Sequence, residues 1–330
     1  MNSRIKLALK ISFVVGLLYF LGKKGFISLD QTQHAILQWR YSLPGMCAFM
    51  FTSMLGVIRW QLLLKAHGIR LPFWRTFQLT YIGLFFNIAL PGAVSGDFVK
   101  AFYVGKEAQG AKTKAFGSIL FDRVAGLSAL VVLSAIAFLI QMAQMSDSNV
   151  LRALQLFVTV AAAVVIAFYA YLFLVREKHD PLLRIFGTLE KRVPKLGIFA
   201  RTYEALRHYH SHRATVLQVL GISVIIHLAV GAGFLFYAYA LGETQLSLLS
   251  LYIIVPIGLL ITAIPVLPAG VGTGHAAFLW LFGLLGCQKG AGANIFSIYA
   301  LSQIVVGVIG GLIYLRFRGT EPAPVIATAN

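Results

Sequence analysis

Apolar residues run through most of the chain in long blocks that polar segments separate. Six of these blocks approach or exceed the roughly 20 residues that a helix needs to cross a bilayer. They cover residues 7–22, 44–64, 116–143, 151–175, 215–241 and 291–315. The pattern predicts six membrane-spanning helices. The first of these is expected to be a retained span, because no small-residue cleavage site follows Leu21.

Two further apolar regions, residues 76–105 and 248–287, are interrupted by proline and glycine. The first contains LPGAVSGD at Leu90–Asp97, and the second contains LPAGVGTGH at Leu267–His275. A broken helix leaves backbone N–H and C=O groups that hydrocarbon cannot satisfy, so such backbone lies within protein or along a wet cavity. We therefore predict that each region forms a re-entrant hairpin, which enters and leaves the membrane on one side.

The composition is that of a membrane protein. Of the 330 residues, 58% are hydrophobic and 12% are charged, whereas a soluble domain is about 25% charged. The mean hydropathy is +0.81. Basic cytoplasmic loops account for the net charge of +17, so no nucleic acid is expected as a partner. Cys47 and Cys287 lie in apolar stretches and are expected to be free thiols.

Basic residues set the predicted orientation. Lys and Arg concentrate in the first ten residues, in the segment 176–214 and just after residue 315, which predicts that these parts and both termini are cytoplasmic. A simple span at 76–105 would place the segment 176–214 outside, so the orientation requires the hairpins. Lys23, Lys24 and Arg40, in the first outer loop, are the exception.

The two broken regions are similar in sequence, and the predicted topology gives them opposite orientations. Residues 44–143 and 215–315 each contain a span, a hairpin and a second span, which is an inverted-topology repeat of the kind common among secondary transporters. The predicted fold class is therefore an all-α polytopic membrane protein. It has about six full spans and two re-entrant hairpins in a single integral membrane domain over 1–330. Residues 319–330 are expected to form a disordered tail.

The segment 176–214 is predicted to be a cytoplasmic amphipathic connector between the two repeats. Apolar residues recur in it at helical spacing on both sides of Pro194. A pair of interfacial helices on anionic headgroups explains this pattern; a solvated connector is the alternative. His208, His210 and His212 alternate along it, a spacing that does not converge on a metal from a helix, so a solvated surface is expected there.

The helix breaks offer backbone groups to a ligand. A helix that starts near Ser95 or Thr273 presents unpaired N–H groups and a partial positive charge, which suits a phosphate. Two such ends that meet near the middle of the membrane can hold one anionic headgroup. The candidate substrate-binding residues at the breaks are Pro91, Gly92, Ser95, Gly96, Asp97, Pro268, Gly270, Gly272, Thr273, Gly274 and His275.

Four charged residues, Asp97, Lys100, Asp122 and Arg123, lie in or beside membrane sequence. A charge at the centre of a span costs about 2.5–3.5 kcal/mol, so such side chains usually face a cavity and form pairs. Asp122 and Arg123 point about 100° apart on a helix. Arg123 is therefore expected to reach Asp97 or a substrate phosphate, with a purely structural Asp97–Arg123 pair as the alternative. Lys100 is expected to extend to the cytoplasmic edge of the membrane.

Other polar residues in membrane sequence have structural interpretations. Arg59 and Arg75 lie near span ends and are expected to anchor the topology. His227 is expected to form a hydrogen bond between helices. The sequence contains no nucleophile elbow, P-loop or zincin helix, so we expect no enzymatic activity, no metal and no cofactor.

Three motifs resemble a known family: NIALPGAVSGDFVKAF at 87–102, LFDRVAGL at 120–127 and PVLPAGVGTGHAAFLWLF at 265–282. Their order and spacing are similar to those of the flippase-like membrane domain of lysyl-phosphatidylglycerol synthases, over about residues 5–315. The resemblance implies an inner-membrane protein that handles lipids. It gives importance to the matching residues Asn87, Pro91, Gly96, Asp97, Asp122 and Arg123.

The chain departs from this family in two respects. Many members carry Glu where His275 stands, which puts a contact to a headgroup amine in doubt there. No soluble aminoacyl-transferase domain follows residue 315, so the chain resembles a stand-alone member and synthase activity is not implied.

The sequence favours transbilayer movement of an anionic phospholipid or lipid-linked headgroup, by a flippase or scramblase with a polar cavity between its two hairpins. Without an ATPase motif, transport is expected to be passive or coupled to an ion or proton gradient, with Asp97 and His275 as candidate proton carriers. The alternatives are a non-catalytic partner of a membrane lipid or glycan biosynthetic complex and, less favoured, a membrane-embedded lipid transferase. The expected location is the bacterial inner membrane.

Overall fold

The computed structural model describes residue 33 and residues 37–90, 95–108, 112–141, 149–175, 180–192, 197–262, 273–288 and 290–317. These residues form helices and the turns that join them, and the described ranges contain no strand. The predicted all-α class is therefore confirmed. The expected first span at 7–22, both helix breaks and the expected tail at 319–330 lie outside the described residues.

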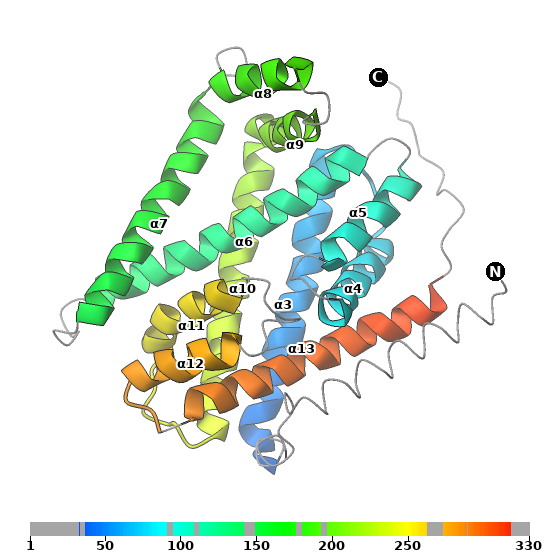
Figure 1. Ribbon diagram of the computed structural model, residues 1–330. Helices are drawn as coiled ribbons and strands as arrows, with labels where there is room; N and C mark the ends of the chain where they lie inside the picture. Colours follow the sequence, from blue (N-terminus) through cyan, green and yellow to red (C-terminus); the bar gives the residue numbers. More distant parts are fainter. Residues whose placement is uncertain are drawn as a thin grey trace.

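Five of the described helices are long and apolar enough to cross a membrane. Each coincides, within a few residues, with a span that the apolar pattern predicts. They are α3 (Trp39–Ala66), α6 (Lys112–Gln141), α7 (Asn149–Leu174), α10 (Arg213–Ala240) and α13 (Ala291–Arg316). The protein is thus an integral membrane protein built from helices (Figure 1).

Four shorter helices form two packed pairs. The first pair is α4 (Phe73–Ala89) with α5 (Ser95–Glu107), and the second is α11 (Leu248–Thr262) with α12 (Thr273–Leu284). The longest has 17 residues, which span about 26 Å at 1.5 Å per residue. That is less than the roughly 30 Å of a bilayer core. These lengths agree with the two predicted hairpins, whose re-entrant character stays a prediction.

Helices α3 and α10 pack side by side in opposite directions at the centre of the molecule (Figure 1). Gly45 near the start of α3 lies against the ring of Tyr237 near the end of α10, and Phe49 lies against Gly233. Glycines let the aromatic rings sit directly on the opposite backbone. This is the way in which membrane helices associate where hydrocarbon gives no hydrophobic driving force.

Helix α13 contacts the first short pair through glycines that allow a close approach. It packs along α4, where Gly310 lies against the carbonyl oxygen of Tyr81 and Gly307 lies against the side chain of Ile88. Gly83 of α4 in turn lies against the backbone of Gly96 in α5. Helix α4 is therefore held between α13 and α5, which fixes its position relative to α3.

The segment between α7 and α10 folds into α8 (Pro181–Arg192), α9 (Gly197–Arg207) and a short 3-10 helix η3 (His208–Ser211), at the top of Figure 1. The segment thus contains two α-helices, α8 and α9, where a helix pair was expected. We call this part of the molecule the connector end. Its location on a membrane surface stays a prediction.

A buried ion pair ties the connector helices to α7. Asp180 is fully buried and its carboxylate lies 2.9 Å from Nε of Arg207. It also accepts hydrogen bonds from the hydroxyls of Tyr171 and Tyr203 and from the N–H of Leu182, so it caps α8. Burial raises the pKa of Asp180, but these hydrogen bonds outweigh it and leave the pKa below its usual value.

A histidine cluster joins the end of α3 to the connector end. His67 is buried, and its ring stacks on His208 and meets Tyr209 edge-on, with both ring centroids 4.9 Å away. The predicted solvated histidine surface is only partly right. His208 and His210 contact the backbone carbonyl oxygens of Ala66 and Leu172, where helices α3 and α7 end.

The stability of the folded protein is expected to depend on pH through the protonation of His67. Burial, and then the positive charges of His208, Lys114 and His212, lower the pKa of His67 to about 4. The folded state therefore keeps His67 neutral, while the unfolded state protonates it below about pH 6.5. Stability due to His67 is complete above about pH 6.5 and is lost as the pH falls towards 4.

Thermal unfolding in detergent between pH 4 and pH 7 tests this expectation. The melting temperature of the wild type should fall as the pH drops below 6.5, and the slope should be shallower for His67→Gln. Equal slopes for the two proteins would show that another group controls the acid sensitivity.

Candidate functional site

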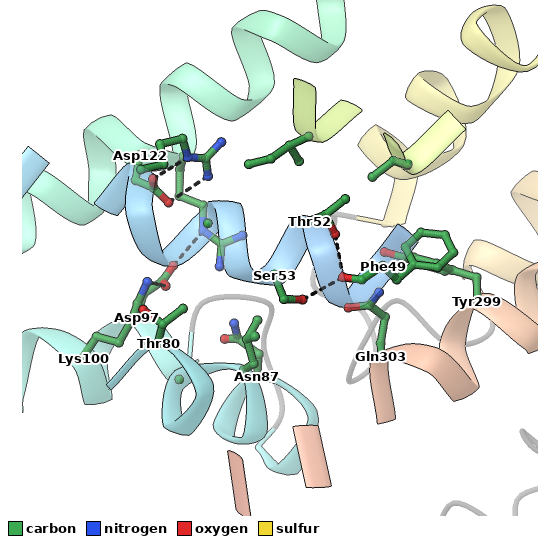
Figure 2. A pocket seen from close by; sticks show the side chains of 17 residues that line it. Phe49, Thr52, Ser53, Thr80, Asn87, Asp97, Lys100, Asp122, Tyr299 and Gln303 are labelled. Carbon is green, nitrogen blue, oxygen red and sulfur yellow. Dashed lines mark hydrogen bonds and ion pairs between the residues drawn. The ribbon is translucent and has the colours of Figure 1, made fainter. Parts of the chain in front are cut away.

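A cavity of about 230 Å³ opens between α3, α4, α5, α6, α10 and α13 (Figure 2). Its wall combines apolar residues with an unusual number of polar and charged ones for a site among membrane-length helices. The lining residues are Phe49, Thr52, Ser53, Gly56, Arg59, Thr80, Gly83, Leu84, Asn87, Asp97, Lys100, Asp122, Arg123, Ile226, Val230, Tyr299 and Gln303.

The α4/α5 pair is closed tightly beside this cavity. The backbone of Gly96 packs directly on the carbonyl of Gly83, so the two helix backbones are in direct contact at this point. Asn87 completes the closure, because its side-chain oxygen accepts a hydrogen bond of 2.8 Å from the N–H of Gly96. That N–H belongs to the first turn of α5 and has no partner within its own helix. Asn87 therefore satisfies one of the N–H groups at the start of α5.

Replacing Gly96 by alanine is expected to destabilise the protein by about 1–3 kcal/mol. The added methyl group would clash with the carbonyl oxygen of Gly83, which is backbone and cannot rotate away. The matched control is Gly56→Ala, because Gly56 also lines the cavity and has nothing within 4 Å of its added Cβ. Denaturant unfolding in detergent compares the two. Equal stability of the variants would contradict the backbone contact.

One carboxylate of the cavity, that of Asp97, is shared by two cations. It lies in the first turn of α5, and its oxygens are 3.2 Å from Nζ of Lys100 and 2.8 Å from Nε of Arg123. Asp97 and Lys100 are buried, whereas the side chain of Arg123 is 46% exposed. The Lys100 ammonium also lies over the ring of Trp60, 4.7 Å from its centroid. Arg123 is therefore the most exposed cation of this group.

The second carboxylate of the cavity, that of Asp122, forms a two-point ion pair with Arg59 across α3 and α6. Nε and Nη2 of Arg59 donate to the two carboxylate oxygens at 2.7 and 3.0 Å, and Nη1 donates to Ser223 on α10 at 3.0 Å. Gly126, one turn beyond Asp122, leaves room for the guanidinium. This pair joins three membrane-length helices.

The charges of the cavity do not balance. Among the described residues that line the cavity, Arg59, Lys100 and Arg123 provide three positive charges against the two carboxylates of Asp97 and Asp122. One positive charge is therefore in excess within this wall. An excess of this sign favours an anion in the cavity, and a guanidinium is the cationic group that best suits a phosphate or carboxylate.

The structure brings five of the predicted residues together in this cavity. Asn87, Asp97, Lys100, Asp122 and Arg123 line the cavity, and the expected contact between Arg123 and Asp97 is present. Ser95 and Gly96 begin α5 beside it. Pro91 and Gly92 lie outside the described residues.

Two expectations about cationic residues were wrong. Lys100 does not extend to the membrane edge, because Asp97 and the Trp60 ring hold its ammonium inside. Arg59 is no anchor at a span end, since it forms the buried pair with Asp122. Its place within apolar sequence, about two turns before the end of α3, was a signal that could have revealed this role. Arg75 pairs with Glu107 at the open end of the α4/α5 pair.

The second helix break contributes little to this cavity in the described residues. Pro268, Gly270 and Gly272 lie outside them. Thr273, Gly274 and His275 begin α12 and are not among the residues that line the cavity. Gly274 packs against the ring of Phe296, and His275 forms a hydrogen bond of 3.0 Å with Ser297 on α13.

His227 has the structural role expected for it. Its Nε2 lies 3.0 Å from the carbonyl oxygen of Gly126, so it links α10 to α6. Within the described ranges, no group of three or more His, Cys, Asp and Glu side chains is arranged to hold a metal ion.

Fold and site together define a helical membrane protein with a charged cavity among its membrane-length helices. The chain matches the model of the lysylphosphatidylglycerol synthase TM region over residues 7–311 and belongs to this family. The expected resemblance is thereby confirmed. The chain is also similar to the UPF0104 membrane protein PH1989 of Pyrococcus horikoshii, with 22% identity over 339 residues, 96% of this chain and 98% of that protein. The family relates the chain to membrane lipids.

Proposed function

We propose that the protein moves an anionic phospholipid or lipid-linked headgroup across the bilayer, as a flippase or scramblase, through the cavity beside the α4/α5 pair. The observation that carries the proposal is the excess positive charge in the wall of this cavity, among helices long enough to span a membrane. A headgroup phosphate would neutralise this excess while the acyl chains stay in the lipid.

The cost of buried charge supports this function. Each ion held in hydrocarbon costs several kcal/mol unless it is paired or faces water. Arg59 and Asp122 satisfy each other, whereas Arg123 is half exposed and shares Asp97 with Lys100. A phosphate that enters the cavity can take the Arg123 guanidinium while Lys100 keeps Asp97 neutralised. The contact between Arg123 and Asp97 is therefore the part of the site that a phosphate can displace.

The arrangement of the short pairs supports alternating access. The turn from α3 to α4 lies at the connector end, because His67 stacks there on His208. The α11/α12 pair begins and ends at the other end of α10. There, Glu243 accepts a hydrogen bond from the N–H of Gln288. We propose that the two pairs are re-entrant hairpins from opposite sides, in an inverted repeat of 44–143 and 215–315. The connector end then faces the cytoplasm, as its basic residues favour.

Reconstitution into phosphatidylcholine vesicles tests the proposal. The vesicles contain a trace of phosphatidylglycerol with a fluorescent acyl chain, and dithionite reduces only the label in the outer leaflet. The full-length protein should make the inner-leaflet label accessible, because the headgroup crosses through the cavity. A labelled phosphatidylcholine, which carries a positive amine, is the control and should cross more slowly. Loss of the phosphatidylglycerol signal no faster than in empty vesicles would contradict the proposal.

A further inference from the structure

The cavity has a second end, which carries no charge. Figure 2 shows Asp97, Lys100 and Asp122 on one side of the cavity and Thr52, Gln303 and Tyr299 towards the other. The uncharged polar residues come from three helices, α3, α4 and α13. They are Thr52, Ser53, Asn87, Tyr299 and Gln303, together with Thr80, which lies beside Asp97 and Lys100 at the charged end. The cavity thus places a charged end and a neutral hydrogen-bonding end next to each other.

The groups at the neutral end can both donate and accept hydrogen bonds. The hydroxyls of Thr52 and Ser53 donate to the carbonyl oxygen of Phe49 at 2.8 and 3.0 Å, which leaves their oxygen lone pairs as acceptors. Gln303 makes no side-chain hydrogen bond to any part of the chain that the structure describes, and its amide offers an acceptor and two donors. Hydroxyl groups of a ligand match this mixture, because each both donates and accepts.

An amine would find no charged partner at this end. The carboxylates that line the cavity are those of Asp97 and Asp122, and both are already engaged by cations. A cationic headgroup would add a positive charge to a wall that already has one in excess. Desolvation of an unpaired ammonium among membrane helices is costly.

We infer that the ligand of this cavity is a phosphate joined to a neutral polyol, such as glycerol or a sugar, rather than an amine-bearing headgroup. The inference rests on the proposed function and specifies its substrate class. The phosphate lies by Arg123 at the charged end, and the hydroxyls lie by Ser53 and Gln303 at the neutral end. The Asn87 amide, which Gly96 fixes, forms the wall between them.

Binding in detergent tests this assignment without requiring transport. The full-length protein is titrated with three dihexanoyl lipids: phosphatidylglycerol, phosphatidic acid and phosphatidylethanolamine. Phosphatidylglycerol should bind about tenfold more tightly than phosphatidic acid, since its diol adds hydrogen bonds, and phosphatidylethanolamine should bind most weakly. Equal affinities, or preference for the amine, would overturn the inference. Glycerol phosphate without acyl chains should bind more weakly than the lipid; equal binding would overturn the assignment to a lipid headgroup.

Variants separate the two ends of the cavity. Gln303→Leu and Ser53→Ala should lower the affinity for phosphatidylglycerol towards that for phosphatidic acid and leave the phosphatidic acid affinity unchanged. Gln218→Leu is the matched control, because Gln218 is exposed on α10 and lines no part of the cavity. If Gln303→Leu lowers the affinity for both lipids equally, the neutral end does not recognise the polyol. Selective binding without transport in vesicles would refute the proposed function and leave this assignment standing.

Discussion

Replacing Arg59 with methionine is expected to destabilise the folded protein by about 3–5 kcal/mol, the usual cost of removing one partner of a buried ion pair. Asp122 would lose both of its hydrogen bonds from the guanidinium and remain as a buried charge among α3, α6 and α10. Its side chain is only 12% exposed, so water cannot replace the lost partner. Ser223 would lose one donor but keep its own hydrogen bond to Val219.

A double variant distinguishes the lost charge partner from lost packing. Arg59→Met combined with Asp122→Leu removes both charges and replaces them by apolar groups, so it should recover most of the stability. Lys65→Met is the matched control at the exposed end of α3, where removal of a cation should change stability by less than about 0.5 kcal/mol. Denaturant unfolding in detergent measures all three. A single Arg59 variant as stable as the Lys65 variant would show that the pair does not hold these helices together.

The sequence predicted the Asp97–Arg123 contact and missed the Arg59–Asp122 contact for a physical reason. Two charges near broken helices must find partners, and few are available in apolar sequence. Which residue of α3 faces Asp122 depends on how α3 is rotated against α6. That rotation is set by packing such as the close approach of Gly126 to Arg59, and spacing along the chain does not report it.

Lys100 shows how an average preference fails at one position. Long cationic side chains near span ends usually reach for the membrane surface. Here Asp97 lies three residues earlier on the same face of α5, and Gly83 leaves room for the Lys100 stem. These local contacts outweigh the general tendency. Predicting these contacts of Lys100 would have required knowing how closely α4 and α5 approach each other.

The second break illustrates the limit of argument from sequence similarity. LPGAVSGD and LPAGVGTGH place Asp97 and His275 at corresponding positions. The residues packed against them differ. Phe296 fills the space beside Gly274, and Ser297 forms a hydrogen bond with a ring nitrogen of His275. Corresponding positions in the two motifs therefore differ in environment, because the neighbouring helices differ: Asp97 lines the cavity, whereas His275 bonds to Ser297.

Replacing Arg123 with alanine is expected to slow headgroup movement by about tenfold to a hundredfold, since charge-assisted hydrogen bonds to a phosphate are worth about 1.5–3 kcal/mol. Its effect on folding should be far smaller than that of Arg59→Met. Lys100 still neutralises Asp97 in the variant, and the half-exposed Arg123 pair is screened by water.

This difference allows transport and folding to be separated in one protein. Vesicle assays and thermal unfolding are carried out on Arg123→Ala, Arg123→Lys and the control Lys65→Ala. Arg123→Lys should be intermediate in transport, because lysine keeps the charge but not the paired donors that grip a phosphate. A slow Arg123→Ala with a near-normal melting temperature places Arg123 on the path of the headgroup. Unchanged transport together with a large loss of stability would make the Asp97–Arg123 pair a structural element instead.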